Sequence, residues 1–149
     1  MGKKKGLGPL SLDASGLCRL MVNQNQVVTF EKSINEGHFY IYAPVGEIQP
    51  GMEKEVGLLA LQGNLFGKET GYASLGYLPK TRSLVLFETF EESRMSYIEF
   101  ERKFEEFAQH LAYWINKLET PTAPSIEELS LDRHVKDLKE HKNLKIFFA

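Results

Sequence analysis

The sequence predicts an α+β fold in which a twisted antiparallel sheet of five strands is packed by helices. Two observations carry this prediction: short β-prone runs occur in groups bounded by turn residues, and two longer segments have apolar residues at helical spacing. The chain has 149 residues, of which 42% are hydrophobic and 26% charged, as in a folded domain. We therefore expect one domain over residues 1–119, a proline-containing linker over 120–125 and a partly helical extension over 126–149.

The first three strands are expected to form a meander. Leu17–Val22 and Val27–Phe30 are β-prone runs separated by polar residues, which is typical of a hairpin. A third run, His38–Ala43, follows a turn signal at Asn35, Glu36 and Gly37. Pro44 has no backbone N–H to donate and is expected to end this strand.

Residues 52–66 have the spacing of a helix that is apolar on two sides. One stripe comprises Val56, Leu59, Ala60 and Gly63, and the other comprises Leu58, Leu61 and Leu65. A surface helix needs one apolar stripe, so the second stripe implies a second partner, either a layer of the same chain or another subunit. Gly57 and Gly63 weaken the helix, which fits a close approach of another backbone. We interpret the segment as an interface helix.

A second hairpin and a long helix complete the domain. The hairpin comprises Ala73–Leu78 and Ser83–Phe90 around a turn with a proline. The helix begins near Ser96, and its large apolar residues recur at steps of three and four: Tyr97, Phe100, Phe104, Phe107, Leu111, Trp114 and Leu118. Core packing explains this spacing better than an aromatic ligand site does. This helix is expected to lie on the sheet.

No constellation of catalytic or cofactor-binding residues emerges. Gly6 and Gly8 lack the third glycine of a dinucleotide loop, and no Walker loop is present. His134, Asp137 and His141 could share a helical face, but a solvated face is the preferred interpretation over a metal site. Cys18 is expected to be a small core residue. We expect no cofactor, no metal and no enzymatic activity, and a small hydrolase or metalloprotein remains a remote alternative.

The net charge and the hydropathy of the chain limit the kinds of partner and the cellular compartment that we expect. The net charge of −2 gives no field that favours nucleic acid, and a single cysteine fits a reducing cytoplasm. Pro9 and Asp13 interrupt the apolar stretch that a secretion signal would need, and no run is long enough to span a bilayer. We therefore expect a cytoplasmic protein that inserts into no membrane.

Three phrases resemble a known family: FYIYAPVGEI, LLALQGNLFGKETGYASLGYLPKTRSLVLFETF and FEEFAQHLAYWINKL. Together they are similar to class I type III secretion chaperones, the CesT/Tir-chaperone-like family, over roughly residues 9–119. The resemblance is carried by LQGNLFG at residues 61–67, the following LGY, the strand SLVL, and Tyr113 with Trp114.

The resemblance implies a bacterial cytoplasmic homodimer that holds the amino-terminal segment of a secreted effector in extended, secretion-competent form. The helix over 52–66 would then be the dimer helix, with candidate interface residues Val56, Leu59, Ala60, Gly63 and Phe66. Candidate effector-binding residues lie on the first three strands: Leu20, Val22, Val28, Phe30, Phe39 and Ile41. An exposed apolar face beside an open strand edge suits an extended peptide.

The chain departs from this family at its beginning. Family members usually start with an amphipathic helix, whereas only MGKKKG precedes the loop at residues 7–10. We expect the first helix to be missing or shortened, and residues 126–148 to pack on the surface it would cover. A regulatory or interaction protein on the same scaffold remains the alternative, as a heterodimeric co-chaperone or as a binder of transcription machinery.

Overall fold

The computed structural model describes residues 14, 16–22, 26–34, 37–119 and 146–147. The described chain contains six strands, two α-helices and two short 3₁₀ turns. Their order is β1 (Leu17–Val22), β2 (Gln26–Lys32), β3 (His38–Glu47), α1 (Glu53–Asn64), η1 (Leu65–Gly67), β4 (Ser74–Leu78), β5 (Ser83–Glu91), η2 (Glu92–Arg94), α2 (Tyr97–Glu119) and β6 (Ile146–Phe147). The expected linker and most of the extension lie outside the described residues.

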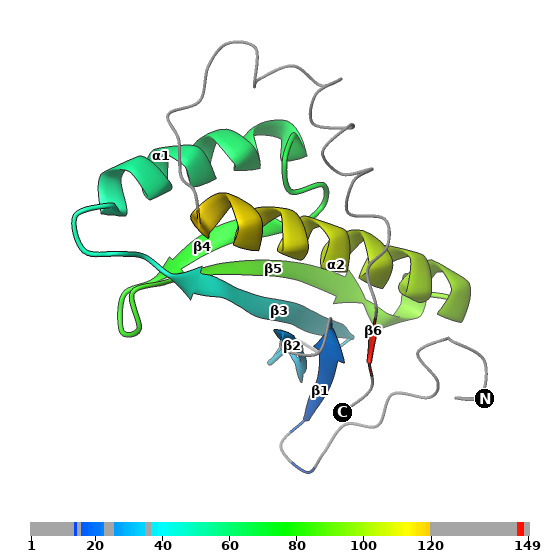
Figure 1. Cartoon of the computed structure of the whole chain (residues 1–149). Helices are drawn as coiled ribbons and strands as arrows, with labels where there is room; N and C mark the ends of the chain where they lie inside the picture. The colour runs from blue at the N-terminus through cyan, green and yellow to red at the C-terminus, as the bar shows by residue number, and fades with distance from the viewer. Residues whose placement is uncertain (1–13, 15, 23–25, 35–36, 120–145, 148–149) are drawn as a thin grey trace.

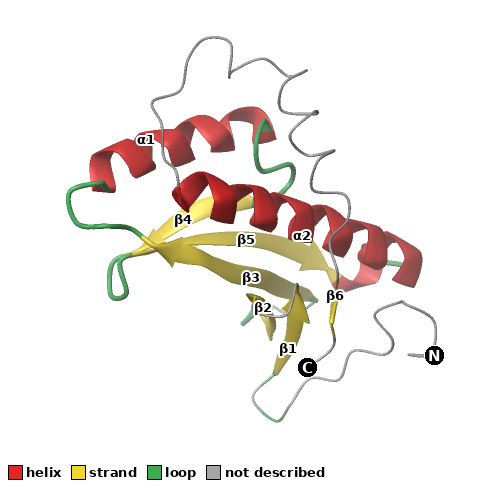
Figure 2. Cartoon of the chain, viewed as in Figure 1, coloured by secondary structure: helices red, strands yellow, loops and turns green. Residues whose placement is uncertain are grey.

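The strands form one antiparallel sheet with the order β4-β5-β3-β2-β1-β6. The α+β fold, the meander, the helix and the second hairpin are confirmed, and the helices lie over the sheet (Figures 1 and 2). The sixth strand was not predicted. It belongs to the carboxyl-terminal extension and pairs with β1, which is the outermost of the five predicted strands in the sheet order.

The third strand is longer than predicted. β3 continues through Pro44, which pairs with Val85, and ends at Glu47. The register between β3 and β5 shifts between Pro44 and Gly46, as at a β-bulge. A bulge interrupts the ladder locally, so the missing proline N–H is tolerated there. The expectation that Pro44 ends the strand was therefore wrong.

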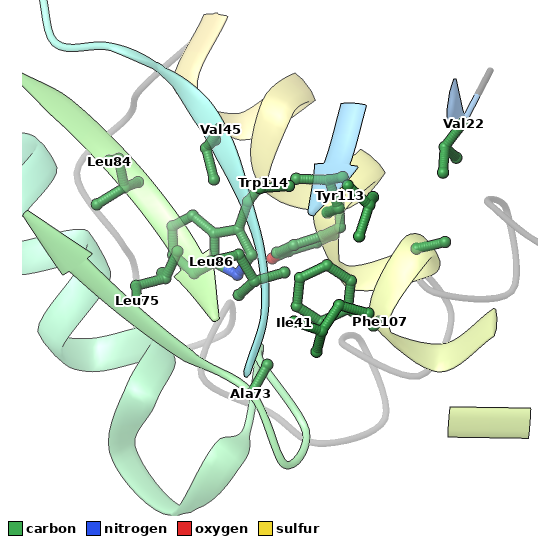
Figure 3. Close-up of a cluster of buried hydrophobic side chains, with 14 of the residues drawn as sticks. Val22, Ile41, Val45, Ala73, Leu75, Leu84, Leu86, Phe107, Tyr113 and Trp114 are labelled. Carbon is green, nitrogen blue, oxygen red and sulfur yellow. The ribbon is translucent and has the colours of Figure 1, made fainter. Parts of the chain in front are cut away.

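The hydrophobic core lies between the sheet and α2. Trp114 and Phe107 of α2 lie among sheet residues such as Ile41 and Leu86, and all four are almost fully buried (Figure 3). At the other end of α2, a cluster of rings with centroids 5.2–6.4 Å apart joins helix and sheet: Phe30, Phe39, Phe90, Phe100 and Phe104. Five of the seven residues in the predicted stripe are buried, which confirms that α2 packs on the sheet.

The helices of the described residues are all too short or too polar to cross a bilayer.

Candidate docking surfaces

The strand residues predicted to bind an effector lie in the core of the chain itself. Leu20, Val22, Val28, Phe30 and Ile41 are each 4% exposed or less, and Phe39 is half-buried against the same core. In this arrangement they face the core of the chain and offer no open surface to a partner. The reason is the period of two in a strand: these residues share the face that α2 covers.

The residues predicted for the dimer interface differ in burial: four are buried and one, Phe66, is exposed. Val56, Leu59, Ala60 and Gly63 are buried within the chain. A Cβ added to Gly63 would overlap the Trp114 ring, so the close approach at this glycine comes from α2 of the same chain. These four residues are corrected to the chain's own core.

Phe66 behaves differently from the other four predicted interface residues. Its side chain is 89% exposed, and its φ of 56° lies in the left-handed region, which is unusual for an aromatic residue. α1 has already ended before this residue, because Leu65 has an extended backbone, and Phe66 lies in the 3₁₀ turn that follows.

The second apolar stripe of α1 is the exposed one. Leu58, Leu61 and Leu65 are 56%, 68% and 51% exposed, and Phe66 continues this stripe. Beside it, β4 forms one border of the sheet and carries Tyr77, which is about half exposed and lies on the face of the sheet that α1 covers. We call Leu58, Leu61, Leu65, Phe66 and Tyr77 the α1–β4 surface.

A hollow of about 310 Å³ lies within the α1–β4 surface. Gly57 and Leu61 line it from α1, and Leu75 and Tyr77 line it from β4. Asn64 fixes the spacing between the two elements, because its side chain donates to the Leu75 carbonyl and accepts from the Leu75 N–H at 3.1 and 2.8 Å. The hollow therefore lies between α1 and β4, whose separation is fixed by these two hydrogen bonds.

Two further hollows border α2 where it meets β1, β2, β3 and the start of α1. One, of about 180 Å³, is lined mainly by Val22, Ala108, Leu111, Ala112 and Ile115. The other, of about 450 Å³, is lined by Val45, Met52, Val56, Ile115 and Leu118 among others. Gln26, Ile115 and Glu119 line both hollows, so the two are adjacent. We call them together the α2 groove.

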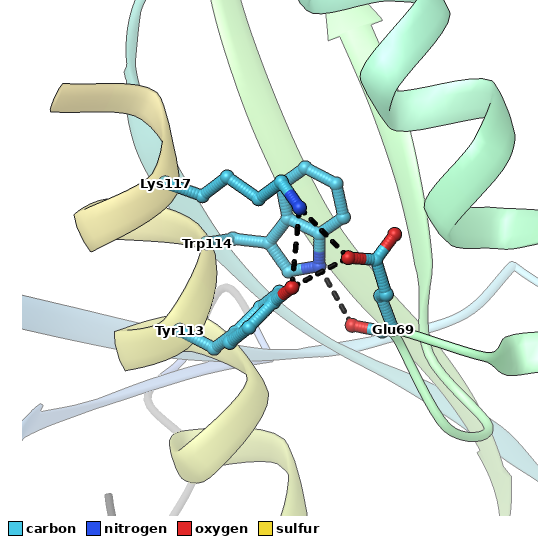
Figure 4. A network of polar contacts seen from close by, with 4 residues as sticks. All are labelled: Glu69, Tyr113, Trp114 and Lys117. Carbon is cyan, nitrogen blue, oxygen red and sulfur yellow. Dashed lines mark hydrogen bonds and ion pairs between the residues drawn. The ribbon is translucent and has the colours of Figure 1, made fainter. Parts of the chain in front are cut away.

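A buried polar network ties the segment after α1 to the end of α2 (Figure 4). The Glu69 carboxylate accepts hydrogen bonds from the Tyr113 hydroxyl and, at 2.9 Å, from Lys117 Nζ. Trp114 Nε1 donates to the Glu69 carbonyl at 2.7 Å. The paired charges are shielded from water, and each has its partner. Sequence reasoning missed this network, because Glu69 lies 44 residues from Tyr113 and no local pattern marks it.

A second carboxylate is buried on the core face of the sheet. Glu88 of β5 is 7% exposed, and burial raises the pKa of its carboxyl group to about 7. Lys103 lowers this pKa and Glu106 raises it, and both lie on α2. Among the described residues, no group of three or more His, Cys, Asp or Glu side chains is placed to hold a metal ion. Cys18 is half-buried.

The described residues thus present three apolar features: an exposed stripe on α1, the α2 groove, and an antiparallel sheet with β4 at one border. A sequence model of the Tir chaperone protein (CesT) family matches residues 1–115. The chain belongs to this family. No curated protein sequence matches it significantly.

Solved structures share the fold at low sequence identity. A chain of the ExsC–ExsE complex matches with a TM-score of 0.60 and 20% identity, over 80% of this chain and 86% of the other. A chain of the heterodimeric ExoU–SpcU complex of the Pseudomonas aeruginosa type III secretion system matches with a TM-score of 0.58 and 21% identity, over 76% and 92%. A chain of the HopA1–SchA chaperone–effector complex matches with 0.58 and 14%, over 72% and 81%.

Proposed function

We propose that this protein is a type III secretion chaperone that binds the amino-terminal segment of an effector in the bacterial cytoplasm and keeps it soluble and competent for secretion. Membership of the CesT family supports this proposal, and so does a fold found in chaperone–effector complexes. The observation that carries it is the α2 groove, which consists of two adjacent hollows lined along α2 by half-buried apolar side chains such as Ile115 and Leu118.

The α2 groove suits the apolar side chains of an unfolded client. Ile115 is half-buried and lines both hollows, and Ala112 leaves room beside it. Ordering an extended client costs at least about 2–5 kcal/mol, so several side chains must each gain burial at about 25 cal/mol per Å². A channel made of two adjacent hollows can hold more than one such side chain.

We also propose that the α1–β4 surface pairs with a second copy of this chain. A stripe of three leucines continued by a phenylalanine that is 89% exposed is costly in water, and the left-handed backbone at Phe66 adds strain. A twofold axis would bring the same surface of two copies together, so one stripe would cover the other. This proposal keeps Phe66 of the predicted interface and replaces the other four predicted residues with the opposite face of α1.

The client site is tested by a matched pair of substitutions in α2. Ile115→Glu places a charge in the α2 groove, whereas Ile98→Glu places the same charge at a position that is 78% exposed and outside the groove. The full chain and both variants would be co-expressed with the first hundred or so residues of each secreted protein encoded beside the chaperone gene. Complexes are then isolated by size-exclusion chromatography, and folding is checked by circular dichroism.

We expect the full chain and Ile98→Glu to form a complex with one of these segments, and folded Ile115→Glu to lose it. Retained binding by folded Ile115→Glu would reject the α2 groove as the client site. Failure of the unaltered chain to bind any of the segments would contradict the proposed chaperone function.

A further inference from the structure

The hollow in the α1–β4 surface is lined mainly by apolar residues. Its walls come from α1 and β4, which lie side by side (Figure 1), and they include Ala60, Leu75 and Leu84. Gly57 leaves part of the α1 wall bare, because a Cβ there would meet no atom within 4 Å. A cavity of about 150 Å³ is enough to hold a benzene ring. The hollow, at about 310 Å³, therefore has room for an aromatic side chain.

Phe66 presents such a side chain to solvent, and it does not line the hollow of its own chain. Phe66 and Gly67 both have left-handed backbones, with φ of 56° and 65°. Glycine adopts this conformation freely, whereas an aromatic residue is strained in it. Strained residues of this kind occur mainly at functional sites, where the strain holds a side chain in a set direction. One chain thus carries both an exposed ring and an empty hollow of suitable size.

A twofold axis perpendicular to α1 brings the ring and the hollow of two copies together. The exposed stripe is centred between residues 61 and 62, because this point is midway between Leu58 and Leu65. In an antiparallel pair of helices about this centre, Leu58 of one copy lies level with Leu65 of the other. Gly57 and Phe66 have the same midpoint, so the ring of each copy lies level with the bare wall of the other copy's hollow.

The charges beside the stripe favour the same arrangement. Glu55 is exposed and Lys68 is half-buried, and the two also have their midpoint between residues 61 and 62. The antiparallel pair therefore places the carboxylate of each copy level with the ammonium group of the other. Ion pairs at the rim of an interface add little affinity, but they favour one register over others. The occupant that suits the hollow is thus a second copy of this chain.

We propose that Phe66 of each copy inserts into the hollow beside Gly57 of the other, and that these two contacts make the α1–β4 surface select an identical chain. This inference rests on the proposed pairing of the α1–β4 surface and names the residue and the hollow that determine which partner is accepted. The contact occurs twice, because a twofold interface uses the same surface of both copies. A related chain without an aromatic ring at this position, or with a filled hollow, is a poor partner.

Removal of the ring tests its role. Phe66→Gly should weaken self-association of the full chain by about tenfold or more in analytical ultracentrifugation, as for a central anchor of an interface. Its melting temperature at low protein concentration should be equal or higher, because glycine adopts the left-handed backbone without strain. A residue that only supports the fold would lower the melting temperature. Ile34→Gly, at a fully exposed position outside the α1–β4 surface, is the control and should keep the original self-association.

A mixed pair of variants tests the hollow. Gly57→Phe fills the hollow from its own chain, so this variant keeps the Phe66 ring but has no place to receive one. Phe66→Gly has the place but no ring. Each variant should bind its own copies poorly, whereas the mixture forms one complete contact and, at the second site, a filled hollow faces a missing ring. With one variant fluorescently labelled, we expect the mixed pair to be about fivefold tighter or more than either variant with itself.

Original self-association in folded Phe66→Gly, or a mixed pair no tighter than the separate variants, would overturn the inference. Both outcomes leave the proposed pairing standing, because that proposal is judged by the doubled mass of the unaltered protein. A single-chain mass for the unaltered protein would overturn the pairing and this inference together. The chaperone proposal is judged separately by capture of an effector segment, and none of these measurements uses an effector.

Discussion

The two α-helices of the described residues bury their apolar stripes in different ways. α2 has one apolar stripe and buries it against the sheet of its own chain, so its large side chains from Phe100 to Trp114 are covered. α1 has two stripes, of which one is covered by its own chain and the other, with Leu61 at 68% exposure, is open. The spacing of apolar residues therefore indicates how many faces of a helix are apolar. It does not indicate whether the same chain or another chain covers each face.

The largest effect is expected on the α2 side. Phe104 is completely buried and packs against Phe30 and Phe100, so Phe104→Ala should lower the free energy of unfolding by about 3–5 kcal/mol through lost burial and the cavity left behind. Urea denaturation measures the change. Ile98→Ala on the exposed side of α2 serves as the control and should change stability by less than about 0.5 kcal/mol. Similar losses for both variants would contradict the assignment of faces.

The contact between the two helices gives the next effect. Gly63→Ala would place a methyl group against the Trp114 ring. The substitution should destabilise the chain by about 1–3 kcal/mol, because a close-packed core accommodates an added methyl group only by shifting its side chains or backbone. Thermal unfolding monitored by tryptophan fluorescence reports on Trp114, the single tryptophan. An unchanged or higher melting temperature would show that α1 does not press on α2 at this point.

A buried carboxyl group in the sheet beneath α2, that of Glu88, makes the stability of the chain depend on pH. The pKa of Glu88 is about 7 in the folded chain and near 4.5 when the carboxyl group is free, so the folded state binds the proton more tightly. Stability is then reduced as pH rises from about 4.5 to 7. Glu88→Gln should raise the free energy of unfolding by on the order of 1–2 kcal/mol at pH 8 and change it little at pH 4. A gain of equal size at both pH values would contradict ionisation as the cause.

The smallest effect is expected on the exposed side of α1. A Cβ at Gly57 would meet no atom of the chain within 4 Å, so Gly57→Ala should stabilise the helix by up to about 1 kcal/mol. Urea denaturation at low protein concentration measures this gain. Gly57 is the natural counterpart of Gly63, since the same substitution in the same helix should have the opposite sign. A loss of stability at Gly57 would show that this side of α1 is already covered within one chain.

The sequence predicted the strands and helices because period and turn signals are local. It also predicted that α1 has two apolar stripes. It did not show that α2 of the same chain covers the stripe with Gly63, because no local pattern indicates that Gly63 lies against Trp114. The strand residues Val28 and Ile41 were placed at a docking surface for the same reason. The sequence of an apolar strand face is the same whether α2 or a client covers that face. β6 and the Glu69 network depend on contacts distant in sequence, which periodicity does not report.

The account depends most on the open stripe of α1, and the mass of the particle in solution tests it most directly. Light scattering coupled to size-exclusion chromatography should give about twice the 17.0 kDa of one chain. Leu61→Glu, which places a charge in the stripe, should give the single-chain mass with an unchanged circular dichroism spectrum, while Ile98→Glu should keep the doubled mass. A single-chain mass for the unaltered protein, or a doubled mass for folded Leu61→Glu, would contradict the account.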